Sequence, residues 1–456
     1  MLIAPIFLCF IKSLGVVVKK IIFDFDFNRA CIGEPQFNKL ISSLVPEIKK
    51  IKGALAEEYK TDYAFLNLLS DKQLSKTINR LINSKRVLDP KILVVIGIGG
   101  SDLGTVAIHE ALNGLLYNEK NPPVKVYFVD TLDSDYLSDI IHLVENNLKE
   151  GENVLVNVVT KSGATTETIA NYEIFLDLVK KYKGENYRDY IVITTDNSSK
   201  FCGYAKKNHI ECLDVPKKVG GRYSVFSAVG LFPLGFLGID IEKLLEGARF
   251  ILKDCLSESV DENPAALSAA IIFYHYNRGI NIHDTFIFSK NVRSFGAWYR
   301  QLVGESLGKK YNKKGDLVEV GITPTVSVGP ADLHSVAQLY LGGPRDKFTT
   351  FITVKNKSNI LLPKIDIFEE FVENIQGRPV SFIMRAIVEG VMAAYQEDDR
   401  PFVSVHIPQK SEFCVGQLLQ WKMLEIVYLG DLFGINPFDQ PQVELYKKET
   451  REILKR

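Results

Sequence analysis

Short apolar segments that alternate with helix-like segments are the feature of this sequence that most limits its fold. In the first half of the chain they lie at 92–96, 124–129, 154–159 and 190–194. In the second half they lie at 285–289, 348–354 and 402–407. Strands that are apolar throughout, instead of at every second residue, are typical of parallel sheets covered by helices on both faces. The sequence therefore predicts an α/β fold with two mostly parallel sheets, each flanked by helices.

The positions of these segments divide the 456-residue chain into two units. We expect a first, smaller unit over 86–240 and a second, larger unit over 241–456, with the mostly helical residues 21–85 packing on the second. Residues 1–20 are apolar but interrupted by Lys12, and they lack the basic stretch and cleavage site of a signal peptide. They are also short and broken for a membrane span. A stray extension or a buried first element is favoured over a signal peptide or anchor, and the segment is left unassigned.

Charge and cysteine content exclude several classes of partner. Lys plus Arg and Asp plus Glu number 55 each, so the chain has no excess positive charge for nucleic acid or an anionic membrane. The six cysteines are scattered without CxxC pairs, which argues against a zinc site or a disulfide framework and fits a reducing cytosol. We therefore expect a cytoplasmic protein with no nucleic-acid partner, no membrane partner and no zinc site. Any recognition of an anion must be local.

The turns that follow the apolar segments are the candidate ligand sites, because ligands of open parallel sheets bind at the carboxyl ends of the strands. The first turn reads GIGGSDLG at 97–104. Asp102 stands where a dinucleotide fingerprint needs glycine, and no Gly-Lys-Ser/Thr follows as in a P-loop. What remains is a turn whose backbone N–H groups, with the hydroxyl of Ser101, can approach a ligand. The alternative is a tight strand-to-helix turn with Ser101 or Asp102 as the helix N-cap.

The second turn, TKSGATTET at 160–168, combines five hydroxyl side chains with Lys161. A helix N-terminus with hydroxyl donors and one lysine suits a single dianionic phosphate. The alternative is a capping box in which Thr165 or Thr166 caps the helix. One cap does not need five hydroxyls, so the phosphate interpretation is favoured.

Two later motifs carry a cation and a carboxylate. Arg222 follows two glycines and precedes an apolar segment, where it can hold an oxyanion or a phosphate oxygen, or else form an exposed salt bridge. Gln301 and Glu305 are four residues apart and share one helical face. Glu305 is a candidate general base, and the alternative is a solvated glutamate paired with Lys309.

A histidine and a lysine near the C-terminus complete the candidates. His334 lies just inside an expected helix start capped by Asp332, where a structural role is the more common one. Lys447 lies in a basic C-terminal helix and would by default be solvated.

Taken together and in order, six motifs resemble those of the phosphoglucose isomerase family. They are GIGGSDLG, TKSGATTET, GGRYSVFSAVGL, QLVGES, DLHSVAQLYLGGPRDKF and NPFDQPQVELYK. The resemblance spans about residues 91–448. It implies two sugar-isomerase domains, a homodimer, no metal or nucleotide cofactor, and a sugar-phosphate substrate. The implied reaction is the reversible conversion of glucose 6-phosphate to fructose 6-phosphate in glycolysis and gluconeogenesis.

The resemblance also implies residue roles. Glu305 would move the proton between C2 and C1 through a cis-enediol, and Arg222 would stabilise the enediolate oxygen. His334, contributed by the partner subunit, and Lys447 would open and close the sugar ring. The substrate-binding residues would be Thr160, Lys161, Ser162 and Thr165 at the phosphate, Gly100 and Ser101 at the sugar end, and Gln301 and Gln440 along the open chain. Two positions depart from the family pattern: Thr160 stands where many members have serine, and Tyr446, beside Lys447, where many have glycine.

Three other functions stay open at this point. A related aldose–ketose isomerase would also accept mannose 6-phosphate. A sugar-phosphate sensor would bind without turnover, and no DNA-binding segment stands out. A dehydrogenase is disfavoured by Asp102.

Overall fold

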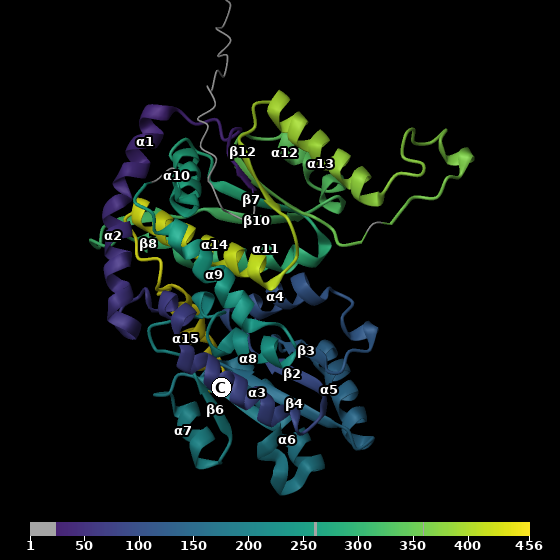
Figure 1. The fold of residues 1–456 in the computed structure, drawn as a ribbon. Coiled ribbons are helices and arrows are strands. Elements are labelled where there is room, and N and C mark those ends of the chain that lie inside the picture. The colour runs from purple at the N-terminus through teal and green to yellow at the C-terminus, as the bar shows by residue number, and fades with distance from the viewer. Residues whose placement is uncertain (1–23, 260–261, 359) are drawn as a thin grey trace, which may run out of the picture.

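The computed structural model describes residues 24–259, 262–358 and 360–456, so the unassigned segment 1–20 lies outside the described residues. Two sheets lie towards opposite ends of the molecule, with helices packed between them (Figure 1). This arrangement confirms the predicted fold class of two mostly parallel sheets flanked by helices.

The first sheet has five strands in the order β3-β2-β4-β5-β6, all pairs parallel. Its strands are β2 (Pro90–Ile96), β3 (Lys125–Val129), β4 (Asn153–Val159), β5 (Ile191–Thr195) and β6 (Glu211–Asp214). The helices that follow them are α4 (Leu103–Asn113), α5 (Ser134–Lys149), α6 (Thr166–Lys183) and α7 (Lys200–Lys207).

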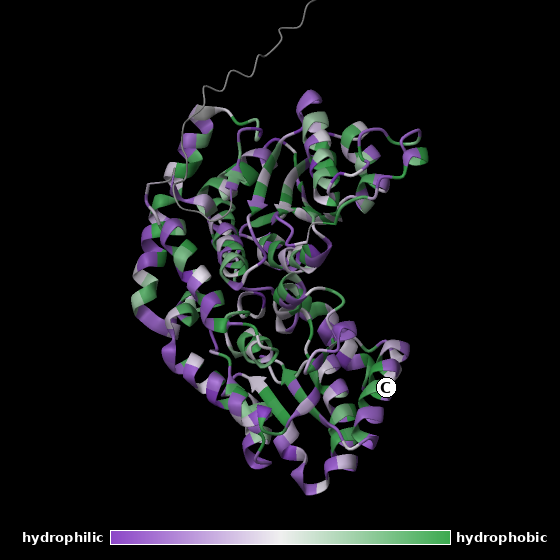
Figure 2. Cartoon of the chain, turned by 45° about the vertical axis from the view of Figure 1, so that its right-hand side comes forward, coloured by the Kyte–Doolittle hydropathy of each residue, from purple (hydrophilic) through white to green (hydrophobic). Residues whose placement is uncertain are grey.

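Both faces of this sheet are buried, which explains why its strands are apolar throughout. In β2, Ile92 and Val94 belong to the hydrophobic cluster that includes α5 and α6. The alternating Leu93 and Val95 belong to the opposite cluster with α4. Figure 2 shows these strands as continuous hydrophobic ribbons beneath helices of mixed character.

The second sheet has the order β1-β12-β11-β7-β10, and only its edge strand β1 is antiparallel to its neighbour. Its strands are β1 (Asp24–Asp26), β7 (Ile282–Phe288), β10 (Thr323–Val328), β11 (Lys347–Val354) and β12 (Phe402–Ile407). A separate hairpin pairs β8 (Lys309–Tyr311) with β9 (Leu317–Val320). The apolar-segment pattern did not indicate β1, β6, β8, β9 or β10.

Helices between the two sheets form the centre of the core. They are α8 (Ala228–Phe236), α9 (Ile241–Cys255), α10 (Pro264–Tyr276), α11 (Arg293–Leu307) and α14 (Glu412–Leu432). The remaining helices are α12 (Ala337–Gly342), α13 (Val380–Glu397) and α15 (Val443–Ile453). In the described part of the chain, none of the helices combines the length and the apolarity needed to cross a membrane.

The N-terminal helices α1 (Glu34–Ser43), α2 (Val45–Ala54) and α3 (Lys72–Arg86) do not pack on one unit alone. Helix α1 contacts α10, whereas α3 contacts α8. These contacts lie on both sides of the expected boundary between residues 240 and 241. That boundary, and the assignment of 21–85 to the second unit, stay predictions.

Candidate active site

Two loops meet at the carboxyl edge of the first sheet. Strand β2 pairs with β4 in parallel, with Ile96 opposite Val158, so both strands end at the same level. The chain then enters the 3₁₀ turn Gly99–Ser101 after β2 and the hydroxyl-rich turn 160–165 after β4. The sheet therefore places the two candidate ligand turns side by side, as expected for a parallel sheet.

The glycine turn packs against protein backbone. A Cβ on Gly100 would lie 2.3 Å from the carbonyl carbon of Gly221 and 2.6 Å from the amide nitrogen of Arg222. The hydroxyl of Ser224 donates to the Gly100 carbonyl at 3.3 Å. The close approach expected here towards a ligand is thus made towards the loop that carries Arg222. Asp102 is the N-cap residue of α4, but its side chain makes no capping hydrogen bond.

Arg222 is buried and fixed at the centre of the site. Its side chain is 1% exposed and its Nη1 lies 3.2 Å from Oε2 of Glu305. Its Nε donates to the hydroxyl of Ser306 at 2.7 Å. The exposed salt bridge considered for Arg222 is therefore wrong, because the guanidinium is enclosed and points at a carboxylate of α11. A cation held in one direction can stabilise charge that develops nearby without reorganising.

The loop at 436–442 supplies the other acceptors of this guanidinium. Nη2 donates to the carbonyls of Pro437 at 2.5 Å and Asp439 at 3.1 Å. Nη1 also donates to Oε1 of Gln440 at 2.9 Å. Every N–H group of Arg222 thus has an acceptor, and Gln440 is held against the cation.

Glu305 and Gln301 lie together on α11. The amide of Gln301 donates to Oε1 of Glu305 at 3.0 Å, as expected for residues on one helical face. The carbonyl oxygen of the Gln301 side chain is buried and has no hydrogen-bond partner among the described residues. Lys309 donates to the backbone carbonyl of Glu305, so the ordinary pairing of Lys309 with this carboxylate is not formed. The Glu305 side chain is 34% exposed and therefore open on one side.

The hydroxyl-rich turn has buried residues on one side and exposed residues on the other. Thr160 is buried, and its hydroxyl lies 3.2 Å from that of Thr165. Thr165 is the N-cap residue of α6, but its side chain makes no capping hydrogen bond, which removes the main support for a capping box there. Gly163 has φ of +65°, and a Cβ on it would lie 2.6 Å from Cβ of Phe201. Ser162 is exposed at the top of the turn, where its hydroxyl accepts from the amide of Ala164.

Lys161 is the lysine of this turn, and the charge of Arg222 acts on it. Its backbone carbonyl accepts from the amide of Asp196 at 3.3 Å and from the hydroxyl of Thr195. Burial lowers the pKa of the Lys161 ammonium, and the positive charge of Arg222 acts in the same direction, while the carboxylate of Asp196 opposes both. The ammonium of Lys161, several hydroxyls and the N-terminus of α6 make this edge of the sheet suited to a dianion.

His334 and Lys447 are not brought to this group of residues. His334 is exposed at the end of the 3₁₀ turn Ala331–His334, and Lys447 pairs with Glu444 of its own helix at 2.8 Å. In the described part of the chain, neither forms a hydrogen bond or ion pair with Arg222 or Glu305. A helical turn does start near Asp332, but it is the short 3₁₀ turn with Pro330 as its N-cap. Asp332 does not cap it, because the Asp332 carboxylate accepts from the amide of Val328, and α12 begins only at residue 337.

Sequence reasoning missed one member of the network, Lys309. It was considered only as an exposed partner for the carboxylate of Glu305, yet it is buried and touches two backbone carbonyls. The signal was its position four residues after Glu305.

Over residues 24–259, 262–358 and 360–456, the structure shows no cluster of three or more metal-ligating side chains.

Comparisons with known proteins concern the whole chain. The family model of phosphoglucose isomerase matches residues 84–456. A glucose-6-phosphate isomerase of Carboxydothermus hydrogenoformans is 36% identical over 373 residues, covering 80% of this chain and 79% of that protein. A probable glucose-6-phosphate isomerase of Methanococcus maripaludis is 34% identical over 418 residues, covering 91% and 90%.

Solved structures show the same fold. A hypothetical protein of Thermus thermophilus superposes with a TM-score of 0.82 at 28% identity, over 95% of this chain and 99% of that one. A glucose-6-phosphate isomerase of Chlamydia trachomatis superposes with a TM-score of 0.80 at 22% identity, over 97% and 91%.

Proposed function

The chain belongs to the phosphoglucose isomerase family, and from this premise we propose that it interconverts glucose 6-phosphate and fructose 6-phosphate. The observation that carries the proposal is the contact between a half-exposed carboxylate and a buried cation, Glu305 and Arg222, beside a turn suited to a phosphate. This combination matches what an aldose–ketose isomerisation requires.

The chemistry assigns different tasks to the two groups. Glu305 takes the proton from C2 of the open-chain aldose, and negative charge builds on the oxygen at C1. Arg222 stabilises that enediolate oxygen, because a fixed cation is worth most where charge develops in the transition state. Glu305 then returns the proton to C1, while the hydroxyl proton on O2 is transferred, net, to O1; the carbonyl is thereby re-formed at C2, which gives the ketose. General acid–base action of this kind contributes about 10²–10⁴-fold in rate.

The two glutamines orient the open chain. The side-chain oxygen of Gln301 is an unpaired buried acceptor next to Glu305, so a substrate hydroxyl that donates to it would remove the cost of leaving it unpaired. Gln440 accepts from the same Nη1 of Arg222 that donates to Glu305. Gly100 and Ser101 form the wall at the sugar end.

The phosphate is bound at a distance from the reacting carbons. Thr160, Lys161, Ser162 and Thr165 surround the N-terminus of the long helix α6, where backbone N–H groups and the helix dipole favour an anion. Binding there holds C1 and C2 against Glu305 and lowers the entropic cost of the proton transfer.

Ring opening and closing require two further groups, for which we propose His334 and Lys447. His334 would come from the partner subunit of a homodimer. Two neighbours of His334, Leu333 and Val336, pack in one hydrophobic cluster with Ile387 and Val388 of α13.

The segment before α13 supports such a dimer. It projects from the body of the molecule (Figure 1) and exposes large apolar side chains, among them Phe371 at 75%, Ile360 at 68% and Ile367 at 63%. Apolar surface of this kind marks a protein–protein contact. A second copy bound there would bury it and carry His334 of one protomer towards the site of the other.

The test is turnover by purified protein in the presence of a chelator. Formation of glucose 6-phosphate from fructose 6-phosphate is coupled to glucose-6-phosphate dehydrogenase, and mannose 6-phosphate is assayed in parallel. We expect turnover of fructose 6-phosphate without added metal. Binding without turnover would instead indicate a sensor, and comparable turnover of mannose 6-phosphate would indicate the broader isomerase. The glycolytic and gluconeogenic role and the cytoplasmic location stay predictions.

A further inference from the structure

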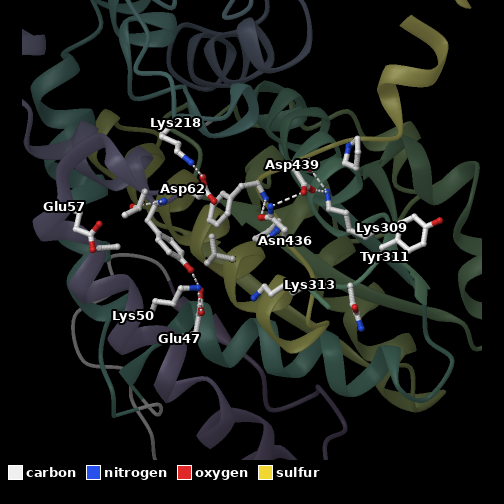
Figure 3. Close-up of a pocket in the computed structure, with 18 of the residues that line it drawn as sticks. Glu47, Lys50, Glu57, Asp62, Lys218, Lys309, Tyr311, Lys313, Asn436 and Asp439 are labelled. Carbon is white, nitrogen blue, oxygen red and sulfur yellow. Dashed lines mark hydrogen bonds and ion pairs between the residues drawn. The ribbon is translucent and has the colours of Figure 1, made fainter. Parts of the chain in front are cut away.

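Lys309 contacts the backbone of Glu305, one of the two proposed catalytic residues Glu305 and Arg222. It is the first residue of β8, two residues after the end of α11, and its side chain is 4% exposed. Its ammonium donates to the carbonyl of Glu305 at 2.8 Å and to the carbonyl of Asp439, and it lies 3.2 Å from Oδ1 of Asp439. Figure 3 shows these contacts between Lys309 and Asp439. The lysine therefore ties the catalytic helix to the loop at 436–442.

The carbonyl of Asp439 is shared by two cations. It accepts from Lys309 and also from Nη2 of Arg222 at 3.1 Å. The next residue, Gln440, accepts from Nη1 of the same arginine. A displacement of this carbonyl would therefore change the directions of both Arg222 and Gln440.

One side of the loop faces a cavity of about 810 Å³, which Lys309 also lines and which neither Arg222 nor Glu305 lines (Figure 3). The ring of Phe438 packs against Tyr63 and Tyr223, and two hydrogen bonds within the loop are local. None of these contacts reaches the carbonyl of Asp439. Among the described residues, the hydrogen bonds to that carbonyl come from Lys309 and Arg222.

Burying the positively charged ammonium of Lys309 beside Asp439 costs free energy. Burial lowers the pKa of Lys309, and the charge of Arg222 acts in the same direction, while the carboxylates of Asp439 and Glu305 oppose it. A buried cation next to a second cation is unfavourable unless its hydrogen bonds are made.

We propose that Lys309 is a positioning residue of the isomerisation site, which fixes the Asp439 carbonyl and thereby aims Arg222 and Gln440 at the reacting carbons. This inference rests on the proposed isomerase function. Lys309 does not touch the substrate, and the phosphate turn at 160–165 does not depend on it. Its loss should therefore lower kcat and leave KM nearly unchanged.

The experiment replaces Lys309 with methionine and, in parallel, with glutamine. Small misplacements of catalytic groups cost up to about 100-fold in rate, so we expect kcat for fructose 6-phosphate to fall by about 10- to 100-fold with KM within about threefold. Lys309→Arg keeps a cationic donor and should recover part of kcat. Lys310→Met, which removes the adjacent exposed lysine, is the matched control and should behave as wild type.

The outcomes separate this inference from the proposed function. An inactive wild-type protein would contradict the isomerase proposal itself. With active wild type, kcat within about threefold of wild type in Lys309→Met or Lys309→Gln would overturn the role of Lys309. A lower melting temperature with unchanged kcat would do the same, because it would show a structural role alone. The glutamine side chain keeps neutral N–H donors but is one atom shorter than lysine, so it does not span the carbonyls of both Glu305 and Asp439. It therefore decides the question if the methionine variant does not fold.

Discussion

Nη1 of Arg222 lies 3.2 Å from Oε2 of Glu305, and the two side chains differ sharply in exposure, at 1% and 34%. The cation is enclosed by the carbonyls and hydroxyl that hold it, whereas the carboxylate is open on one side. This asymmetry fits a fixed electrostatic group beside a base that must reach a substrate carbon.

Replacing Arg222 with lysine tests whether catalysis needs only the positive charge or also the directed hydrogen bonds of the guanidinium. Lysine keeps the positive charge but cannot serve all the acceptors that the guanidinium serves. Loss of one fixed donor to a developing oxyanion costs about 10²–10³ in kcat, and we expect a loss in this range. Steady-state kinetics check the rate, and urea unfolding should show destabilisation by about 1–3 kcal/mol from the unpaired carbonyls. A variant with wild-type kcat would contradict the role of the guanidinium.

Gly100→Ala tests the backbone contact between the two loops. The added Cβ would lie 2.3 Å from the carbonyl carbon of Gly221, so the loop that carries Arg222 must move. Overpacking of this kind costs about 1–3 kcal/mol, and kcat should fall with it. Gly203→Ala is the control, because a Cβ there meets nothing within 4 Å in helix α7. Equal melting temperatures and rates for the two variants would show that the contact does not position Arg222.

The lowered pKa of Lys161 predicts a pH dependence. The protonated ammonium binds the phosphate, so binding weakens as pH rises through its pKa in the folded protein. Because burial lowers that pKa, the loss should begin at a lower pH than for an ordinary lysine. A plot of kcat/KM against pH, which reports the free enzyme, should fall on the alkaline side. In Lys161→Arg this decline should move to higher pH; an unmoved decline would assign it to another group.

A mixture of two inactive variants tests whether each site uses two subunits. If His334 of one protomer completes the site of its partner, Glu305→Gln and His334→Ala subunits complement each other. Half of the dimers formed at random are mixed, and each carries one intact site, so about a quarter of wild-type activity should return. The two variants are mixed under denaturing conditions, refolded and assayed. No gain over the separate variants, with mixed dimers demonstrated, would place His334 outside the partner's site.

Much of the fold was predictable because burial on both faces leaves a clear mark on the sequence. Strands β2, β4 and β11 are buried along most of their length and coincide with segments expected from sequence. Strands β6 and β10 read ECLD and TPTVSV, and neither is a continuous apolar run. They lie at the edges of their sheets, where one side has no neighbouring strand and polar residues are tolerated. The antiparallel β1 has only three residues and carries no such signal.

The candidate site was predictable in its members more than in its geometry. Spacing alone paired Gln301 with Glu305, since both lie on one helix. The burial of Arg222 and Lys309 could not be read from spacing, because both donate to residues at 437–440, more than a hundred positions later. The glycines at 97–104 likewise indicated a close backbone contact, but the sequence did not indicate that the contact is with the backbone of Gly221 and Arg222.

The most direct test of the account is proton transfer in deuterated water by wild-type protein and Glu305→Gln. Wild type should convert fructose 6-phosphate to glucose 6-phosphate with deuterium incorporated at C2, followed by NMR. The variant should lose at least about 10³-fold of both turnover and incorporation while it still binds the sugar phosphate, since only the base is removed. Deuterium incorporation by Glu305→Gln at a rate near that of wild type would show that Glu305 is not the base.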